Sequence, residues 1–329
     1  MSGRRMAWGA LLVPGLVAAF ALALGVGATD LSPSEVVEIL FGNGADGVHA
    51  AVVMRVRLPR ALLAALVGGA LSVSGAAFQA TLRNPLADPY LLGVSGGAAL
   101  GAGIALVIGG GSSAAVPAAA FAGALAALAV VYVVARAHQG GAHTLILSGV
   151  MVGTFCSAGL LFLLWTLPAD PSRSALFWLA GDLGGGDVSR LGPVAVLAAT
   201  AFAALWVGGP SLDLLSQGEA TASDLGLDVG RTRLWVFAAA GLLTAAAVAM
   251  AGLVGFVGLV VPHAVRVVWG PTHRRLLPAA AVAGAAFLLL ADAVARRVLA
   301  PAEVPVGVVT ALVGAPFFLM LLRRRGGKA

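Results

Sequence analysis

The spacing of charged residues is the feature that most constrains this chain. Eight stretches carry no Asp, Glu, Lys or Arg. Their bounding residues and lengths are Arg5 and Asp30 (24 residues), Arg60 and Arg83 (22), Asp88 and Arg136 (47), Arg136 and Asp170 (33), Arg190 and Asp213 (22), Arg233 and Arg266 (32), Arg275 and Asp292 (16), and Glu303 and Arg323 (19). A helix needs about 20 apolar residues to cross about 30 Å of hydrocarbon. The 47-residue stretch therefore holds two crossings, and the 32-residue stretch holds one crossing and a short segment interrupted by Gly and Pro. The total is about ten transmembrane helices.

Composition agrees with this interpretation. Charged residues are 10% of the 329 and hydrophobic residues are 60%, whereas soluble domains have about 25% charged residues. So few charges exclude a soluble globular protein and a disordered one. We therefore predict an all-α polytopic membrane protein, in which residues 1–329 form a single transmembrane domain with no appended soluble domain.

The distribution of Lys and Arg predicts the orientation. With ten crossings and both termini in the cytoplasm, 13 of the 20 basic residues lie inside and 7 lie outside, as the positive-inside rule favours. The net charge of +6 is explained by this orientation, so no nucleic-acid partner is expected. The first apolar stretch, at 24 residues, is longer than a cleavable signal sequence and is predicted to be a retained helix. An external amphipathic helix is expected near Leu31 to Leu40, capped by Ser34.

The sequence lacks the residues that chemistry or ion coupling would need. The only lysine is Lys328, so no P-loop for ATP is possible, and the single cysteine, Cys156, excludes disulfides and cysteine-ligated metals. No clustered set of His, Asp and Glu suggests a metal or cofactor site. Asp292 is the nearest candidate for an ionisable group inside the membrane, and its spacing from Arg275 places it close to the outer interface. The chain must take its energy from a partner or act as a passive pore.

Several motifs, in order along the chain, resemble one protein family. They are Arg57-Leu58-Pro59-Arg60, Arg83-Asn84-Pro85-Leu86-Ala87-Asp88-Pro89, Leu92-Gly93-Val94-Ser95-Gly96-Gly97, Gly255-Phe256-Val257-Gly258-Leu259-Val260-Val261-Pro262-His263, and Pro305-Val306-Gly307-Val308 followed by Gly314-Ala315-Pro316-Phe317-Phe318. Together they resemble the permease subunits of bacterial ABC importers for ferric siderophores, haem and cobalamin. The resemblance covers nearly the whole chain.

The resemblance implies a transport subunit without an ATPase site of its own. Such permeases sit in the bacterial inner membrane, surrounded by lipid, and have ten transmembrane helices. They form homodimers that bind two cytoplasmic ATPase subunits and a periplasmic or lipid-anchored substrate-binding protein. ATP and Mg²⁺ are then bound by the ATPase subunits, and no cofactor is expected on this chain.

The resemblance also assigns roles to three sets of residues. Docking of the binding protein is implied for Arg57, Arg60 and Arg296. Coupling to the ATPase is implied for the inside segment 208–233, and within it for Leu215, Gln217, Gly218, Glu219, Ala222, Leu225 and Gly226. The translocation path and its inner gate are implied for Ala142, His143, Thr144, Ser148, Gly149, Gly153, Thr154 and Ser157.

The cargo is less constrained than the class of transporter. The stretch from Phe177 to Gly185 resembles siderophore or cobalamin permeases more than haem permeases, which implies a ferric siderophore first, cobalamin next and haem third. The alternative interpretation is an ion-coupled secondary transporter or a channel. The near absence of ionisable residues inside the membrane counts against it.

Overall fold

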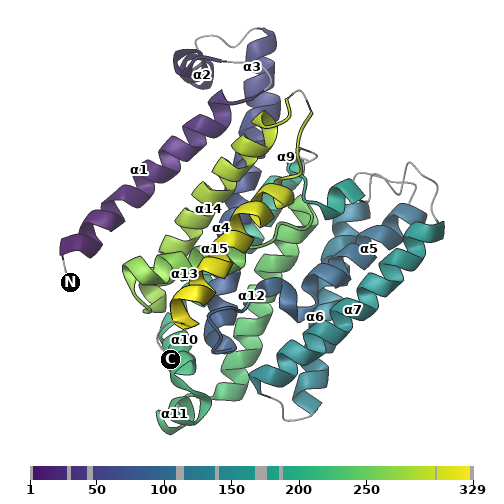
Figure 1. Cartoon of the computed structure of the whole chain (residues 1–329), viewed down its shortest axis with the longest axis vertical. Helices are drawn as coiled ribbons and strands as arrows, with labels where there is room; N and C mark the ends of the chain where they lie inside the picture. Colours follow the sequence, from purple (N-terminus) through teal and green to yellow (C-terminus); the bar gives the residue numbers. More distant parts are fainter. Residues whose placement is uncertain are drawn as a thin grey trace.

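The protein is a bundle of helices. The computed structural model describes residues 3–27, 31–42, 47–108, 115–137, 141–166, 176–184, 188–300 and 302–326, and contains no strand within them. Figure 1 shows most of the long helices running between two ends of the molecule, with α2 and α3 at one end and α10 and α11 at the other. The elements are α1 (Gly3–Gly25), α2 (Pro33–Leu40), α3 (Val48–Val52), a π-helical turn η1 (Val53–Arg57), α4 (Leu58–Thr81), a 3₁₀ turn η2 (Pro89–Leu92), α5 (Val94–Ile108), α6 (Ala115–Ala137), α7 (Ala142–Thr166), α9 (Val188–Val207), α10 (Gly209–Gln217), α11 (Glu219–Asp224), α12 (Val229–Ala251), α13 (Val257–Trp269), α14 (His273–Arg297) and α15 (Val306–Gly326).

Six helical segments are long and apolar enough to cross a membrane. They are Val48–Thr81, Ala115–Ala137, Ala142–Thr166, Ser189–Val207, Val229–Ala251 and His273–Arg297. Four shorter apolar helical segments accompany them: Leu11–Gly25, Val94–Ile108, Val257–Trp269 and Val306–Met320. The segment expected to be short and interrupted is α13, which has 13 residues with Pro262 inside it.

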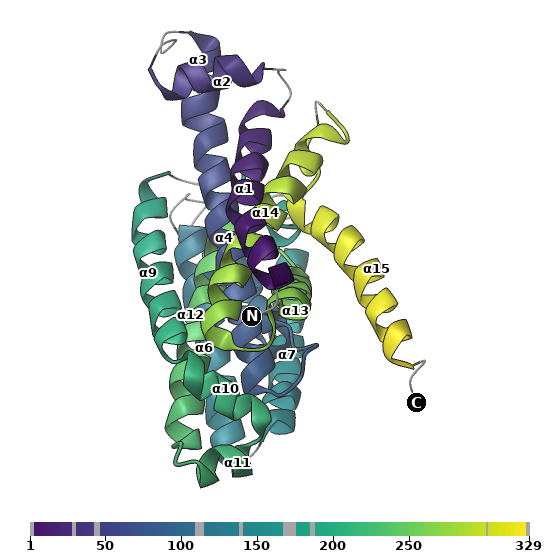
Figure 2. The same ribbon diagram turned by 90° about the vertical axis from the view of Figure 1, so that its left-hand side faces the viewer.

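Helix α4 occupies the centre of the bundle and is buried along most of its length. It packs against α12, α13 and α14, and Figures 1 and 2 show α14 running beside it. A Cβ atom at Gly68 would collide with the carbonyl oxygen of Gly284 in α14, and one at Gly75 would collide with that of Gly258 in α13. The helices therefore touch backbone to backbone, as small residues allow where lipid provides no hydrophobic drive for association.

A second close pair joins α5 and α6. A Cβ atom at Gly97 would meet Gly123, and one at Gly101 would meet Ala119. These two glycines lie four residues apart on one face of α5, so they form a continuous strip along which α6 packs. Figure 1 shows α5, α6 and α7 grouped on one side of the molecule, whereas α1 lies on the other. In Figure 2, α9 and α15 stand at opposite edges.

The connection from α4 to α5 is irregular apart from η2, and most of its residues are buried or partly buried. Asn84 Oδ1 accepts a hydrogen bond from the backbone N–H of Leu86 at 2.9 Å, and Asp88 Oδ1 accepts one from that of Tyr90 at 2.8 Å. Gly93 has a φ of +77°, which lets the chain turn into α5. Irregular backbone is tolerated in a membrane protein where the protein itself surrounds it.

One predicted helix cap is wrong by two residues. The amphipathic helix α2 begins after Ser32 and not after Ser34. Ser32 Oγ accepts from the backbone N–H of Glu35 at 3.3 Å, while the backbone N–H of Ser32 donates to Glu35 Oε2 at 2.8 Å. This reciprocal pair is a capping box. It requires Glu at the third helical position, a spacing that Ser32 satisfies and Ser34 does not.

Candidate functional site

A cluster of four charged side chains lies at the end of the bundle that carries α2 and α3. Asp292 of α14 sits between two arginines: Arg60 Nε is 2.9 Å from Asp292 Oδ1, and Arg296 Nε is 3.0 Å from Asp292 Oδ2. The second contact is an ion pair without the alignment of a hydrogen bond. Arg60 Nη1 also donates to Glu303 Oε2 at 2.7 Å. The cluster therefore ties α4, α14 and the connection to α15 together.

Two of the predicted docking arginines also hold the end of α1. Arg57 Nη1 donates to the carbonyl oxygens of Leu24 and Gly25 at 2.8 and 2.9 Å. Arg296 donates to those of Val26 and Ala23 at 2.6 and 2.7 Å. Carbonyl groups in the last turn of a helix have no partner within the helix, and cations are favourable there. These arginines therefore satisfy the carboxyl end of α1 and fix it to η1 and α14.

The structure thus places all three predicted docking residues inside the subunit. Arg57, Arg60 and Arg296 are only 4%, 9% and 7% exposed. At the same end, Arg55 and Arg297 are the arginines whose side chains are exposed among the described residues of α3 to α4 and α14. No local pattern indicates this difference, because the partners of the buried arginines lie far away in the chain. The docking role itself stays a prediction.

The opposite end carries the predicted coupling segment as two short helices, α10 and α11. Gly218 separates them with a φ of +124°, and Gly226 follows α11 with a φ of +84°, backbone conformations that glycine adopts without strain. Leu215 and Ala222 are buried against the bundle. Gln217, Leu225 and Gly226 are exposed, whereas Gly218 and Glu219 are partly buried. Leu225, 62% exposed, is a large apolar side chain at the tip.

Ion pairs tie these short helices to the long ones. The His273 ring Nδ1 lies 2.6 Å from Asp213 Oδ1 of α10, and the backbone N–H of His273 donates to the same oxygen at 2.9 Å. Burial raises the pKa of Asp213, but the hydrogen bonds from His273 outweigh it and keep that pKa below 3.8. Glu219 of α11 pairs with Arg233 of α12 and, at 3.8 Å, with Arg83 after α4.

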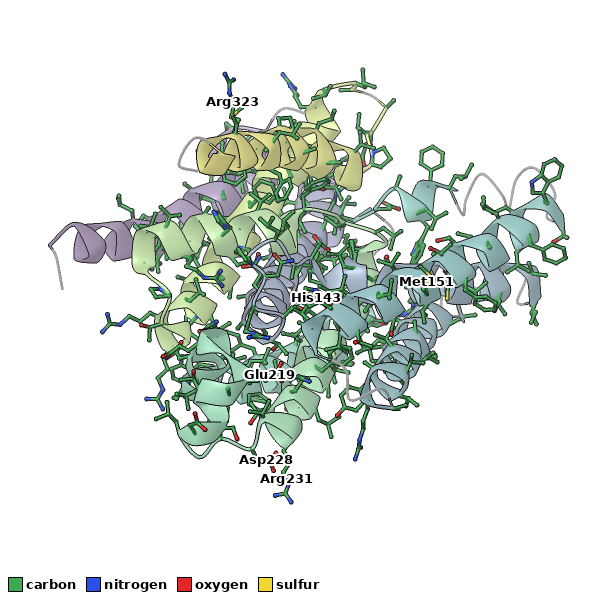
Figure 3. The ribbon with its side chains drawn as sticks, turned by 60° about the horizontal axis from the view of Figure 1, so that its bottom comes forward. His143, Met151, Glu219, Asp228, Arg231 and Arg323 are labelled. Carbon is green, nitrogen blue, oxygen red and sulfur yellow. The ribbon has the colours of Figure 1, made fainter. Side chains whose placement is uncertain are left out.

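Of the residues in these pairs, Asp213, Glu219 and Arg233 lie within the predicted coupling segment 208–233, but only Glu219 is among the residues named individually for coupling. The residues Arg83, Asp213, Arg233 and His273 carry no local motif for pairing, and 60 residues separate Asp213 from His273. Figure 3 looks toward this end and shows Glu219, Asp228 and Arg231 near one another, with His143 on α7. We call α10, α11 and the side chains that hold them (Arg83, Arg233 and His273) the coupling corner.

The predicted path residues on α7 divide between two faces. His143, Thr154 and Ser157 are exposed. Thr154 and Ser157 follow His143 by 11 and 14 residues, which are close to whole numbers of helical turns. They form one stripe with the exposed side chains of Leu147, Val150 and Leu161. Ala142, Ser148 and Gly149 are buried, whereas Thr144 and Gly153 are partly buried. Gly149 and Gly153 let α7 approach η2 and α5, since a Cβ atom at Gly149 would collide with Leu91.

The described residues contain no group of three or more His, Cys, Asp or Glu side chains arranged to hold a metal ion. Among the described residues, the ion pairs lie at the two ends of the molecule, in the cluster around Asp292 and at or next to the coupling corner.

We predict that Asp292→Asn destabilises the protein far more than Glu303→Gln. Both substitutions remove a carboxylate partner of Arg60, but Asp292 is 1% exposed and Glu303 is 50% exposed. Breaking a buried ion pair costs about 3–5 kcal/mol, whereas an exposed pair contributes about 0–1 kcal/mol. Thermal unfolding of the two purified variants in detergent measures the loss of stability that each substitution causes. Equal losses for the two variants would contradict a structural role for Asp292.

Comparison with known proteins agrees with the arrangement of the helices and the motifs. Residues 15–324 match the FecCD transport family. The chain is 47% identical over 283 residues to the cobalamin import system permease protein BtuC of Halobacterium salinarum, covering 84% of this chain and 75% of that one. It is 37% identical over 309 residues to the Fe(3+)-citrate import system permease protein YfmE of Bacillus subtilis, covering 94% and 92%.

A solved structure agrees as well. An inward-facing conformation of an ABC transporter of metal-chelate type superposes with a TM-score of 0.83 at 32% identity, and the match covers 95% of this chain and 97% of that one. With its apolar helices and these relatives, the protein is a multi-pass protein of the inner membrane. The chain belongs to the FecCD transport family.

Proposed function

We propose that this chain is the permease subunit of an ATP-driven importer for a metal chelate. One observation carries the proposal: a structure of a metal-chelate type ABC transporter shares its fold over 95% of the chain. The names of the relatives point to the same class of cargo. The chain itself has no lysine within its apolar segments and no P-loop. The energy is supplied by ATPase subunits, which bind the ATP and Mg²⁺.

Ten crossings with both termini in the cytoplasm are part of this proposal. The six long apolar segments and the four shorter ones add to ten. α1 runs toward the end that carries α2 and α3, and α15 returns toward the end that carries α10 and α11. This arrangement puts the coupling corner inside, where an ATPase is available, and the cluster around Asp292 outside.

We further propose that two copies form the translocation path between their α7 helices. The stripe with His143, Thr154 and Ser157 presents weakly polar groups among exposed aliphatic side chains. The Thr154 hydroxyl donates to the carbonyl oxygen of Val150 at 2.8 Å, so its polarity toward the path is low. A weakly polar surface suits a bulky solute that must pass without being retained. His143, at the inner end of the stripe, is the candidate gate residue.

The cargo is proposed from the relatives. Identity to the cobalamin permease is 47% and identity to the Fe(3+)-citrate permease is 37%. Cobalamin therefore moves ahead of a ferric siderophore as the first cargo to test, and haem stays third.

Uptake into proteoliposomes tests the function. The protein is reconstituted with its ATPase and binding protein, and cobalamin, a ferric siderophore and haem are offered separately. We expect accumulation of one chelate only when ATP is present on the ATPase side. Protein reconstituted alone, with a proton or sodium gradient, is the control. Accumulation there without nucleotide would support the ion-coupled alternative instead.

Glu219→Gln tests the coupling corner. The substitution removes the charge that holds α11 to Arg83 and Arg233. We expect ATP hydrolysis by the complex to remain near normal while uptake falls about tenfold, within the usual range of coupling free energies. Asp224→Asn is the matched control, because Asp224 is an exposed carboxylate of the same helix. If the two variants transport equally well, the ion pairs of Glu219 do not transmit the motion.

Glu303→Gln tests whether Arg60 receives an acidic group of the binding protein. Glu303 is half exposed, and its Oε2 already accepts a hydrogen bond from Arg60 Nη1. Glu303 therefore competes with any carboxylate of the binding protein for Arg60. We expect its neutralisation to strengthen docking about fivefold at low salt and less at high salt. Glu38→Gln removes an exposed acid of α2 and controls for net charge. If the affinities of both variants equal that of the unaltered protein, Arg60 has no part in docking.

A further inference from the structure

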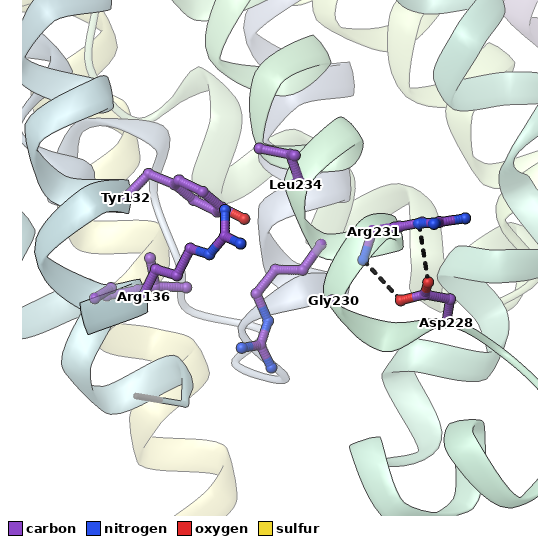
Figure 4. A pocket seen from close by; sticks show the side chains of 9 residues that line it. Tyr132, Arg136, Asp228, Gly230, Arg231 and Leu234 are labelled. Carbon is purple, nitrogen blue, oxygen red and sulfur yellow. Dashed lines mark hydrogen bonds and ion pairs between the residues drawn. The ribbon is translucent and has the colours of Figure 1, made fainter. Parts of the chain in front are cut away.

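A pocket of about 400 Å³ opens between α6, α7 and α12, next to the coupling corner. Tyr132 and Arg136 line it from α6, Leu145 from α7, and Arg231, Arg233 and Leu234 from α12. Figure 4 shows this pocket with Tyr132 and Arg136 on one side and the start of α12 on the other. Arg231 and Arg233 lie within the predicted coupling segment 208–233, but no lining residue is among those named individually for docking, coupling or the path.

The lining of the pocket is positively charged. Three arginines face one lining carboxylate, Asp228, which gives +3 − 1 = +2, and the pairing of Glu219 with Arg233 leaves +1. Arg231 is turned toward Asp228, whose Oδ2 lies 3.2 Å from Arg231 Nε. Arg136 makes no ion pair with the described residues and is exposed. Its guanidinium therefore offers a fork of N–H donors to an oxyanion.

Apolar side chains border the same pocket. Leu145 forms a buried wall, and Leu234 is 44% exposed at the rim. On α6, Val133 follows Tyr132 in the chain and lies outside the residues that line the pocket; it is 64% exposed on the surface of the helix. A ligand that fills this site would gain from having both an anionic group and an apolar portion. A free inorganic anion would use only the arginines.

The position of the three arginines along their helices also suits contact with a lipid headgroup. Arg136 lies in the last turn of α6, and Arg231 and Arg233 lie in the first turns of α12. In the proposed topology these turns are at the inner surface of the membrane, at the level of the phosphate groups of the inner leaflet. Basic pockets between transmembrane helices on this side bind anionic headgroups.

We propose that this pocket binds the phosphate group of an anionic phospholipid of the inner leaflet. Arg136 is the main contact for the phosphate, and the acyl chains run along Val133 and Leu234. The lipid then lies between the start of α7 and Arg233, the residue that holds Glu219 of the coupling corner. The proposal uses the proposed topology, but its test measures binding and does not depend on uptake.

Native mass spectrometry of the full-length protein in detergent tests the proposal. The protein is titrated with phosphatidylglycerol, with phosphatidylcholine, and with inorganic phosphate in millimolar excess. We expect phosphatidylglycerol to be retained in preference to phosphatidylcholine. Arg136→Gln should weaken its binding about fivefold, the effect of one arginine near an anionic headgroup. Arg136→Lys should retain part of the affinity.

Arg275→Gln is the matched control, because Arg275 is an exposed arginine at the same end of the bundle and lies outside the pocket. We expect it to bind phosphatidylglycerol as the unaltered protein does. An unchanged melting temperature of Arg136→Gln shows that the fold is intact. Equal binding of the two lipids, or no loss in Arg136→Gln, would overturn the proposal. Displacement of the lipid by inorganic phosphate would overturn the choice of a lipid as the ligand.

Discussion

The contact of α4 with α14 is the interaction on which the rest of the structure depends. The two helices approach so closely that the backbone at Gly68 meets that at Gly284. In a membrane, van der Waals contact of this kind takes the place of the hydrophobic effect as the cause of helix association. The pair also reaches both ends of the molecule. Arg60 and Asp292 belong to the end that carries α2 and α3, and Arg83 and His273 to the end that carries α10 and α11.

This geometry gives the cluster around Asp292 and the coupling corner a shared mechanical support. A displacement of α10 or α11 acts on α14 through His273 and on α4 through Arg83. Because α4 and α14 cannot slide past each other without separating their glycines, the displacement moves them as one body. The buried cluster at the other end, where Arg60 meets Asp292, moves with them. The ion pairs at the two ends are thus joined by packing and not by a chain of polar groups.

Much of the architecture was predictable because the constraint behind it is local. Charges cannot lie within a crossing helix without cost, so their spacing indicated the apolar segments and the short α13. Glycines four residues apart, such as Gly97 and Gly101, likewise mark a packing face through spacing alone, and Gly218 and Gly226 mark the ends of the two short helices. These predictions needed only neighbours within a few turns.

The candidate sites were less predictable because their contacts join distant parts of the chain. Arg60 and Asp292 are 232 residues apart, so nothing near Arg60 indicates that its guanidinium is already occupied. On α7, apolar residues occur on all sides, and the sequence could not show that His143 is exposed while Ser148 is buried. The cap of α2 was a local error, since both Ser32 and Ser34 are acceptable capping residues and only the position of Glu35 distinguishes them.

The arginines that hold α1 have a consequence for biogenesis. α1 leaves the ribosome long before α14, yet one of the side chains that satisfies its last carbonyl groups, Arg296, lies 270 residues beyond Val26. Until α14 is synthesised, the carbonyl groups of Ala23 and Val26 must rely on water or headgroups at the membrane surface. The contacts of α1 are completed only after α14 has been inserted, so a helix that is made early is fixed in place late.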